Sequence, residues 1–312
     1  MKKYGNLIVI SACMLAFPLL LVYGQALGQG VKNGLTLAYR AVLPSLFPAA
    51  VVCAVIGEMA EALPLPPTVT LWAQSQLCGF PLGIKTVARA FQRGLLDREQ
   101  AIALSRCCAN ASPAFLINYV GAGILGDTRY GLLLWGGQLA ISFLIALRGG
   151  IFKGKRILFS DRRPIVGLLA EGIASAAVGC LNLTGFIVFF SALATLPGVG
   201  WVHPFLEVTG GIGRLNVGQL GWAGILIGFS GLSVLLQNAG YLAAEGLPIG
   251  PMIQSKFLYA LALPLIAGGW DRFPLATGAI FALFILFLIS FDKRKKRRYN
   301  KQERMILTRS VL

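Results

Sequence analysis

Residues 68–85 read TVTLWAQSQLCGFPLGIK, an apolar stretch that Gly79, Pro81 and Gly83 interrupt. The stretch is too short to cross a bilayer comfortably, since a transmembrane helix takes about 20 residues. Glycine and proline also free backbone hydrogen-bonding groups, which hydrocarbon cannot satisfy. Such a break survives only where other parts of the protein or a water-lined cavity cover it. We therefore predict a re-entrant or broken helix inside a membrane protein.

A second interrupted stretch lies at 204–216, where the sequence reads PFLEVTGGIGRLN. It is shorter still, and we read it as a second re-entrant or broken helix. A Gly-Phe element also occurs twice, as GFPLG at 79–83 and as GFSGLS at 228–233. Paired interruptions of this kind point to two related halves, arranged as an inverted repeat around a central site.

The composition of the whole chain supports a membrane location. Of its 312 residues, 56% are hydrophobic and 13% are charged, and the mean hydropathy is +0.73. A soluble domain has roughly 25% charged residues, so a soluble enzyme, a disordered chain and a transmembrane barrel fit poorly. We predict an all-α polytopic membrane protein with about eight transmembrane helices plus two re-entrant or broken helices. The expected spans are 6–23, 41–62, 110–126, 130–147, 180–197, 217–240, 249–268 and 273–291.

The charge distribution predicts the orientation. The chain has 28 Lys and Arg against 12 Asp and Glu, and basic residues gather at 148–163 and 293–298, beside apolar runs. Such residues stay on the cytoplasmic side and attract anionic lipids. We expect a multi-pass protein of a bacterial cytoplasmic membrane with both termini cytoplasmic and anionic lipids at the basic loop and tail. The densest basic cluster, at 293–298, has no interleaved aromatic residue for base stacking, so nucleic acid is not an expected partner.

The chain divides at the basic loop. The expected units are an N-terminal signal-anchor span at 1–30, a first half at 31–147, the basic cytoplasmic loop at 148–164, a second half at 165–291 and a basic cytoplasmic tail at 292–312. The first apolar run also resembles a cleavable secretory signal. We favour an uncleaved span.

Metal and cofactor chemistry is not expected. The six cysteines form no CxxC motif, and His203 is the only histidine. With His203 as the single histidine, neither a conventional zinc site nor a Ser-His-Asp hydrolase is expected. We predict no cofactor, no metal and no catalytic residue; an intramembrane enzyme with a Ser112 and Lys85 dyad is the third reading of the function.

The residues around the breaks suit ligand binding. Burying a charge in the bilayer costs at least about 2.5–3.5 kcal/mol, so Lys85, Glu207, Arg214 and Lys256 each need a partner or a wet cavity. We hypothesise that Lys85 and Glu207 face one polar cavity as a pair; the alternative for Lys85 is snorkelling to the cytoplasmic face. The hydroxyl and amide groups could equally serve as interhelical hydrogen bonds. The candidate ligand-binding residues are Gly79, Pro81, Gly83, Lys85, Asn110, Ser112, Glu207, Thr209, Gly210, Ser230, Ser233 and Gln237.

An ordered set of motifs gives a family resemblance. They are LPSLFP at 43–48, CGFPLGIK at 78–85, NASPAF at 110–115, LEVTGG at 206–211 and GFSGLSV at 228–234. The set resembles the YlbJ-type sporulation integral membrane proteins, within the nucleoside-recognition (Gate) family. The chain departs from the family pattern at Leu82 and at Gly210, where TGG stands in place of TNG.

The resemblance implies a function in spore coat or cortex formation. It implies a transporter-like Gate core in each half that binds or moves a small polar solute, with membrane or spore-morphogenesis proteins as further partners. The alternative is a non-transporting membrane scaffold that uses its basic loop and tail for docking. A transporter predicts a polar cavity between the two breaks, whereas a scaffold leaves the core dry.

Overall fold

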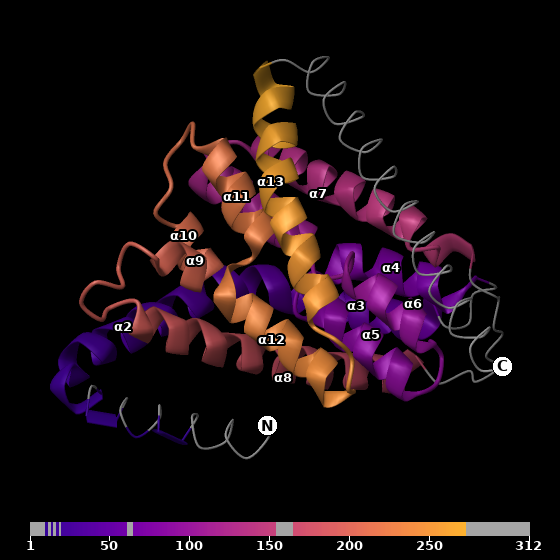
Figure 1. The fold of residues 1–312 in the computed structure, drawn as a ribbon, viewed down its shortest axis with the longest axis horizontal. Helices are drawn as coiled ribbons and strands as arrows, with labels where there is room; N and C mark the ends of the chain where they lie inside the picture. Colours follow the sequence, from indigo (N-terminus) through magenta and orange to yellow (C-terminus); the bar gives the residue numbers. More distant parts are fainter. Residues whose placement is uncertain are drawn as a thin grey trace, which may run out of the picture.

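The structure is a computed structural model that describes residues 20–60, 65–153 and 165–272, together with residues 10, 11, 14, 17 and 18. Within these ranges every regular element is a helix, which confirms the all-α class (Figure 1). In chain order the elements are α2 (Gly24–Leu37), η1 (Ala38–Val42), α3 (Leu43–Ala60), α4 (Pro67–Cys78), α5 (Leu82–Gln92), α6 (Arg98–Ser105), η2 (Phe115–Ile124), α7 (Thr128–Arg148), η3 (Ile151–Lys153), α8 (Ile165–Leu193), α9 (His203–Leu206), α10 (Val208–Ile212), α11 (Leu220–Phe229), α12 (Gly231–Ala244) and α13 (Gly250–Arg272).

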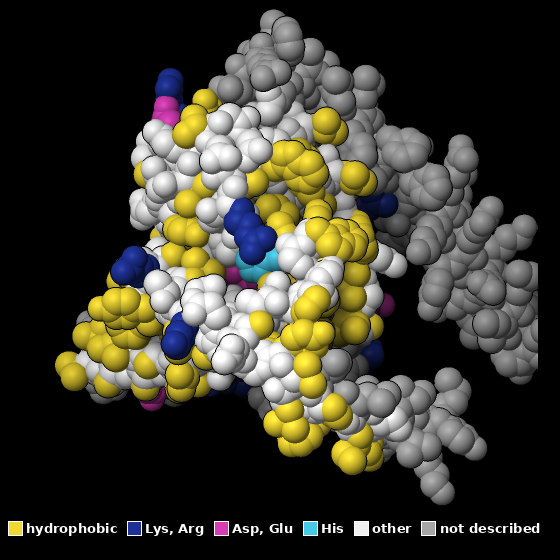
Figure 2. Space-filling view, turned by 90° about the vertical axis from the view of Figure 1, so that its left-hand side faces the viewer, with side chains coloured by type: hydrophobic (Ala, Val, Ile, Leu, Met, Phe, Trp, Pro, Cys, Tyr) yellow, Lys and Arg dark blue, Asp and Glu magenta, His cyan; other side chains and the backbone are white. Residues whose placement is uncertain are grey.

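The helices have the length and surface of membrane segments. Four described stretches are long and apolar enough to cross a bilayer: Gly24–Gly57, Thr128–Arg148, Val166–Leu193 and Leu220–Ala244. Large apolar side chains lie on the outside, such as Val166 at 80% and Leu181 at 72% exposure. Figure 2 shows hydrophobic side chains over much of one face. An apolar surface of this extent is typical of contact with lipid or with another protein.

Two long helical elements lie side by side on the outside of the bundle. The continuous run of α2, η1 and α3 contacts α8 along its length, and Figure 1 shows α2 next to α8. The approach is close because Gly30 and Gly34 face α8. A Cβ atom at Gly30 would lie 2.6 Å from Ala192 Cα, and one at Gly34 would lie 2.7 Å from Val188 Cα.

The inner helices pack around α13. Helices α11 and α13 form the most extensive helix pair among the described elements, and in Figure 1 they run at a steep angle to the direction of α8. Gly224 and Gly228 of α11 make this approach possible, since a Cβ atom at either would lie within 3.0 Å of the α13 backbone. The core between α7, η2, α11 and α13 contains fully buried side chains such as Leu116, Leu134 and Leu263.

The stretch 68–85 forms a helical hairpin, α4 and α5, as its interruption predicts. Pro67 opens α4, where a missing N–H is tolerated. Gly79 ends it with a φ of 70°, a left-handed conformation that suits glycine. The tip of the hairpin packs against the non-helical segment 106–112, and the Phe80 N–H donates to the Asn110 carbonyl over 2.6 Å.

Three expected spans need correction. The span expected at 110–126 is not one helix, because residues 109–112 are not helical and η2 covers only Phe115–Ile124. The span at 217–240 is interrupted at Ser230, whose φ is 71°. The helix expected at 180–197 begins far earlier, at Ile165.

The Gly-Phe elements also differ from each other. GFPLG forms the hairpin tip, whereas GFSGLS lies within the interrupted α11–α12 helix. The expected span at 273–291 and the tail at 292–312 lie outside the described residues, as do half of the span at 6–23 and most of the loop at 148–164.

Replacing Gly83 with alanine should destabilise the protein. A Cβ atom at Gly83 would overlap the carbonyl oxygen of Cys108, and overpacking of this kind costs about 1–3 kcal/mol. The control is Gly136→Ala in α7, where nothing lies within 4 Å and alanine favours the helix. Thermal unfolding of the purified protein should show a lower Tm for Gly83→Ala alone. Equal Tm changes at the two positions would show that the hairpin tip is not held against residues 106–112.

Candidate functional site

The first interruption brings five predicted site residues together. A Cβ atom at Gly79 would overlap the backbone nitrogen of Ser112, and Gly83 faces Cys108 in the same close manner. Asn110 and Ser112 therefore lie directly on the hairpin tip, and both are buried. Pro81 is also buried and precedes α5, where its carbonyl accepts from the Lys85 N–H over 3.1 Å.

Side chains from other helices satisfy the backbone of residues 106–112. The Gln138 amide of α7 pairs with Ala111 twice, accepting from its N–H over 3.0 Å and donating to its carbonyl over 2.9 Å. The Cys107 carbonyl accepts from Ser142 over 2.9 Å and from Gln76 over 3.1 Å. These bonds replace the intrahelical bonds that the break removes, which allows non-helical backbone to lie in an apolar core.

A buried polar network surrounds Asn110. Its amide nitrogen donates to Gln76 Oε1 over 2.9 Å and lies 3.3 Å from the Tyr259 hydroxyl. All three side chains are at most 3% exposed. Asn110 Oδ1 has no hydrogen-bond partner among the described residues. The network therefore joins α4, the interruption and α13, and it keeps one acceptor free.

The second interruption is centred on Glu207, between α9 and α10. Its carboxylate accepts from the N–H groups of Thr209, over 3.0 Å, and Gly210, over 2.5 Å. It is 1% exposed, and it caps the short α10 helix. A Cβ atom at Gly210 would lie 2.8 Å from the ring of His203. Figure 2 shows this histidine in a hollow of one face, close to a basic side chain.

The two interruptions meet inside the protein. Phe80 and Ser112 from the first and Glu207 and Thr209 from the second line one cavity. Its volume is about 10 Å³, which is close to the space that one water molecule takes. Tyr119 of η2 strengthens the junction by donating from its hydroxyl to the Thr209 carbonyl over 3.1 Å.

A third interruption, at Ser230, adjoins the second. A Cβ atom at Gly231 would lie 3.0 Å from the Val208 nitrogen at the start of α10. The helix that follows, α12, contains three buried polar residues, Ser233, Gln237 and Asn238. Their side-chain polar atoms have no hydrogen-bond partners within the described part of the chain. Buried groups of this type are usually satisfied, so they are candidates for contact with water or a solute.

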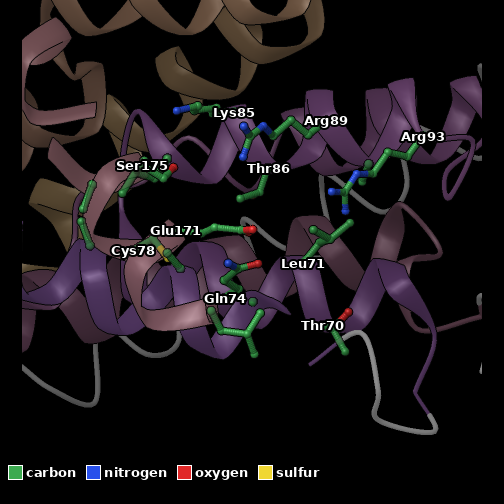
Figure 3. Close-up of a pocket in the computed structure, with 18 of the residues that line it drawn as sticks. Thr70, Leu71, Gln74, Cys78, Lys85, Thr86, Arg89, Arg93, Glu171 and Ser175 are labelled. Carbon is green, nitrogen blue, oxygen red and sulfur yellow. The ribbon is translucent and has the colours of Figure 1, made fainter. Parts of the chain in front are cut away.

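Lys85 and Glu207 line different cavities, so the hypothesis that they face one polar cavity as a pair is wrong. Lys85 lines a separate, wide cavity of about 510 Å³ between α3, α4, α5 and α8 (Figure 3). Arg89 and Arg93 follow Lys85 along α5, with Glu171 and Gln74 on the facing side. Glu207 instead has its carboxylate on the α10 backbone. The first hairpin therefore adjoins two separate cavities, the wide one that Lys85 lines and the small one that Glu207 lines.

Lys256 is the main residue that the candidate set misses. It is 1% exposed, its Nζ has no hydrogen-bond partner among the described residues, and it lies 5.0 Å from the centre of the Tyr259 ring. The sequence signal is its place in the polar run Gln254-Ser255-Lys256 inside an apolar helix. Gln76, Gln138 and Ser142 are also missed, although each is a polar residue within an apolar run.

Replacing Lys256 with methionine should preserve or raise thermal stability. Methionine has a similar length, and removing a buried amine that has no hydrogen-bond partner among the described residues removes a desolvation cost. Ser255→Ala is the neighbouring control, because that hydroxyl donates to the Met252 carbonyl over 2.7 Å. The prediction is tested by measuring the Tm of each purified variant against that of the wild type. A large fall in Tm for Lys256→Met would mean that the amine has a structural partner.

Comparison with known proteins agrees with the motif resemblance. The chain is similar to the sporulation integral membrane protein YlbJ of Bacillus subtilis (strain 168), with 22% identity over 329 aligned residues that cover 83% of this chain and 81% of that protein. No family model matches the chain, and no solved structure matches it. The similarity confirms the expected resemblance to YlbJ-type proteins, and the apolar helices agree with a multi-pass membrane protein.

Proposed function

We propose that the protein acts in the membrane of a sporulating bacterium and that its core binds or moves a small polar solute. The sporulation context is supported by the similarity to YlbJ, which is named as a sporulation integral membrane protein. The observation that supports a solute site is the junction of interrupted helices, where Phe80, Ser112, Glu207 and Thr209 line one cavity. Interrupted helices near the middle of a membrane are typical of transport sites.

The order of elements supports a repeated, Gate-like core. In the first half, the hairpin α4–α5 precedes an element interrupted at 106–112. In the second half, the short pair α9–α10 precedes α11–α12, which is interrupted at Ser230. The same sequence of hairpin and broken helix thus occurs on both sides of the 148–164 loop. We propose that the halves 31–147 and 165–291 are inverted copies, flanked by the outer spans of an eight-span protein.

Uptake by reconstituted protein tests the solute site. Liposomes containing the full chain should accumulate at least one member of a panel of nucleosides, divalent metal ions and small anions. Gln237→Met should abolish this accumulation with little change in Tm, because the amide of Gln237 forms no hydrogen bond in the described protein. Leu236→Met, on the exposed side of the same helix, is the matched control and should retain uptake.

A scaffold that moves no solute is the second candidate. It is favoured by the small volume of the cavity where the interruptions meet, about 10 Å³. If the wild-type protein neither binds nor accumulates any member of the panel, the transport proposal fails and the scaffold remains.

We propose further that both termini are cytoplasmic, since the basic clusters at 148–163 and 293–298 would then lie on one side. A reporter that fluoresces only in the cytoplasm, fused after Leu312, should give a signal. An enzyme reporter that is active only outside the cytoplasmic membrane serves as the reciprocal fusion, and its activity at this position would refute the orientation.

A further inference from the structure

The wide cavity beside the first hairpin has the size of a ligand site. Its volume of about 510 Å³ lies within the range of roughly 300–1,000 Å³ that is usual for small-molecule pockets. It extends inward to buried Gln74 and Cys78, and Cys78 adjoins the hairpin tip at Gly79. At its outer end Arg89 and Arg93 are exposed, so a ligand can enter from that side. The cavity therefore connects the surface with the first interruption.

The basic residues of the cavity share one face of α5. Lys85, Arg89 and Arg93 recur every four residues, which places them in a row about 12 Å long. Like charges at this spacing destabilise a helix slightly, so helix stability does not explain the row. Figure 3 shows the three side chains along the same helix, above the cavity.

The residues that line the cavity have a net positive charge. Among the described residues that line it, Glu171 is the only acidic one, against Lys85, Arg89 and Arg93. The lining thus has two positive charges in excess, whichever cation Glu171 contacts. Positive charge in a partly enclosed, largely apolar cleft attracts anions strongly. Hydroxyl groups of Thr86 and Ser175 and the amide of Gln74 supply further polar contacts.

We propose that this cavity binds a phosphate group, with Lys85 and Arg89 as its principal ligands. A phosphate monoester has a charge of about −1.5 to −2 at pH 7. This charge is close to the two positive charges by which the cations of the lining exceed its one acidic residue. Guanidinium groups bind phosphate oxygens in pairs, and a lysine ammonium adds a compact positive charge. The remaining volume, beside Leu71, Leu82 and Leu168, accommodates the apolar or organic part of the ligand.

The phosphate could come from a soluble phosphorylated molecule or from a lipid headgroup. This inference deepens the proposed function, since a soluble phosphorylated ligand would be the solute. It also stands apart from that proposal, because binding is measured without transport. A neutral solute that is accumulated without phosphate binding would leave the proposed function intact and refute the inference. Phosphate binding without uptake of any solute would support the inference and refute the proposed transport.

Binding of labelled inorganic phosphate to the full chain in phosphatidylcholine nanodiscs tests the soluble source. Nanodiscs that also contain phosphatidic acid test the lipid source, by the amount of this lipid that copurifies after detergent exchange. The double variant Lys85→Gln with Arg89→Gln should weaken either interaction by at least about tenfold, since charge-assisted bonds are lost. The exchange Lys85→Arg with Arg89→Lys keeps the charge and should retain binding.

The matched control is Lys32→Gln with Arg40→Gln, which removes the same charge from exposed positions of α2 and η1, outside the cavity. Saturable phosphate binding that only the cavity variant loses supports a soluble ligand. Selective loss of phosphatidic acid in that variant supports a headgroup. Absence of both interactions in the wild type, or equal losses in the cavity variant and the control, would overturn the proposal.

Discussion

The structure depends on satisfying backbone groups where helices are interrupted inside an apolar core. Residues 109–112 are not helical, and the side-chain amide of Gln138 satisfies the backbone of Ala111 there by accepting from its N–H and donating to its carbonyl. Unsatisfied N–H and C=O groups in a dry environment would cost several kcal/mol each. The same constraint explains Glu207, whose carboxylate accepts from two N–H groups at the start of α10. Amide and carboxylate side chains thus allow irregular backbone, and with it a polar site, to lie at the centre of the protein.

The positions of two breaks, at 79–83 and around Glu207, were predictable from sequence because they are encoded locally. Glycine and proline at 79–83, and glycines around 210, interrupt apolar stretches in ways that the chain itself reveals. The close approaches at Gly79 and Gly83 agree with this reading. The all-α class and the membrane character follow equally from composition. Apolar runs of about 20 residues are long enough to cross a bilayer as helices, and a helix satisfies its own backbone hydrogen bonds there.

The other interruptions and the position of Lys85 depend on contacts between residues far apart in the sequence, which a local sequence pattern does not reveal. Residues 110–126 are apolar enough overall to predict a span, but the Gln138 side chain on another helix bonds both backbone groups of Ala111, where the chain is not helical. Ser230 adopts its left-handed conformation against the start of α10, and it is not a glycine. The pairing of Lys85 with Glu207 failed for the same reason, since only the packing of α5 against α3 and α8 decides which cavity Lys85 lines.

The long pair formed by α2–α3 and α8 has a consequence for how the protein fits its bilayer. The stretch Gly24–Gly57 has 34 residues, so it is about 50 Å long, whereas the hydrocarbon layer is about 30 Å thick. Because α8 packs along it, neither helix can change its inclination alone. The pair must therefore lean strongly or leave the hydrocarbon at one end, with the headgroups reaching Lys32 and Arg40. The thickness of the surrounding membrane would then set the tilt of this outer wall, and through α3 and α8 the width of the cavity that they help to enclose.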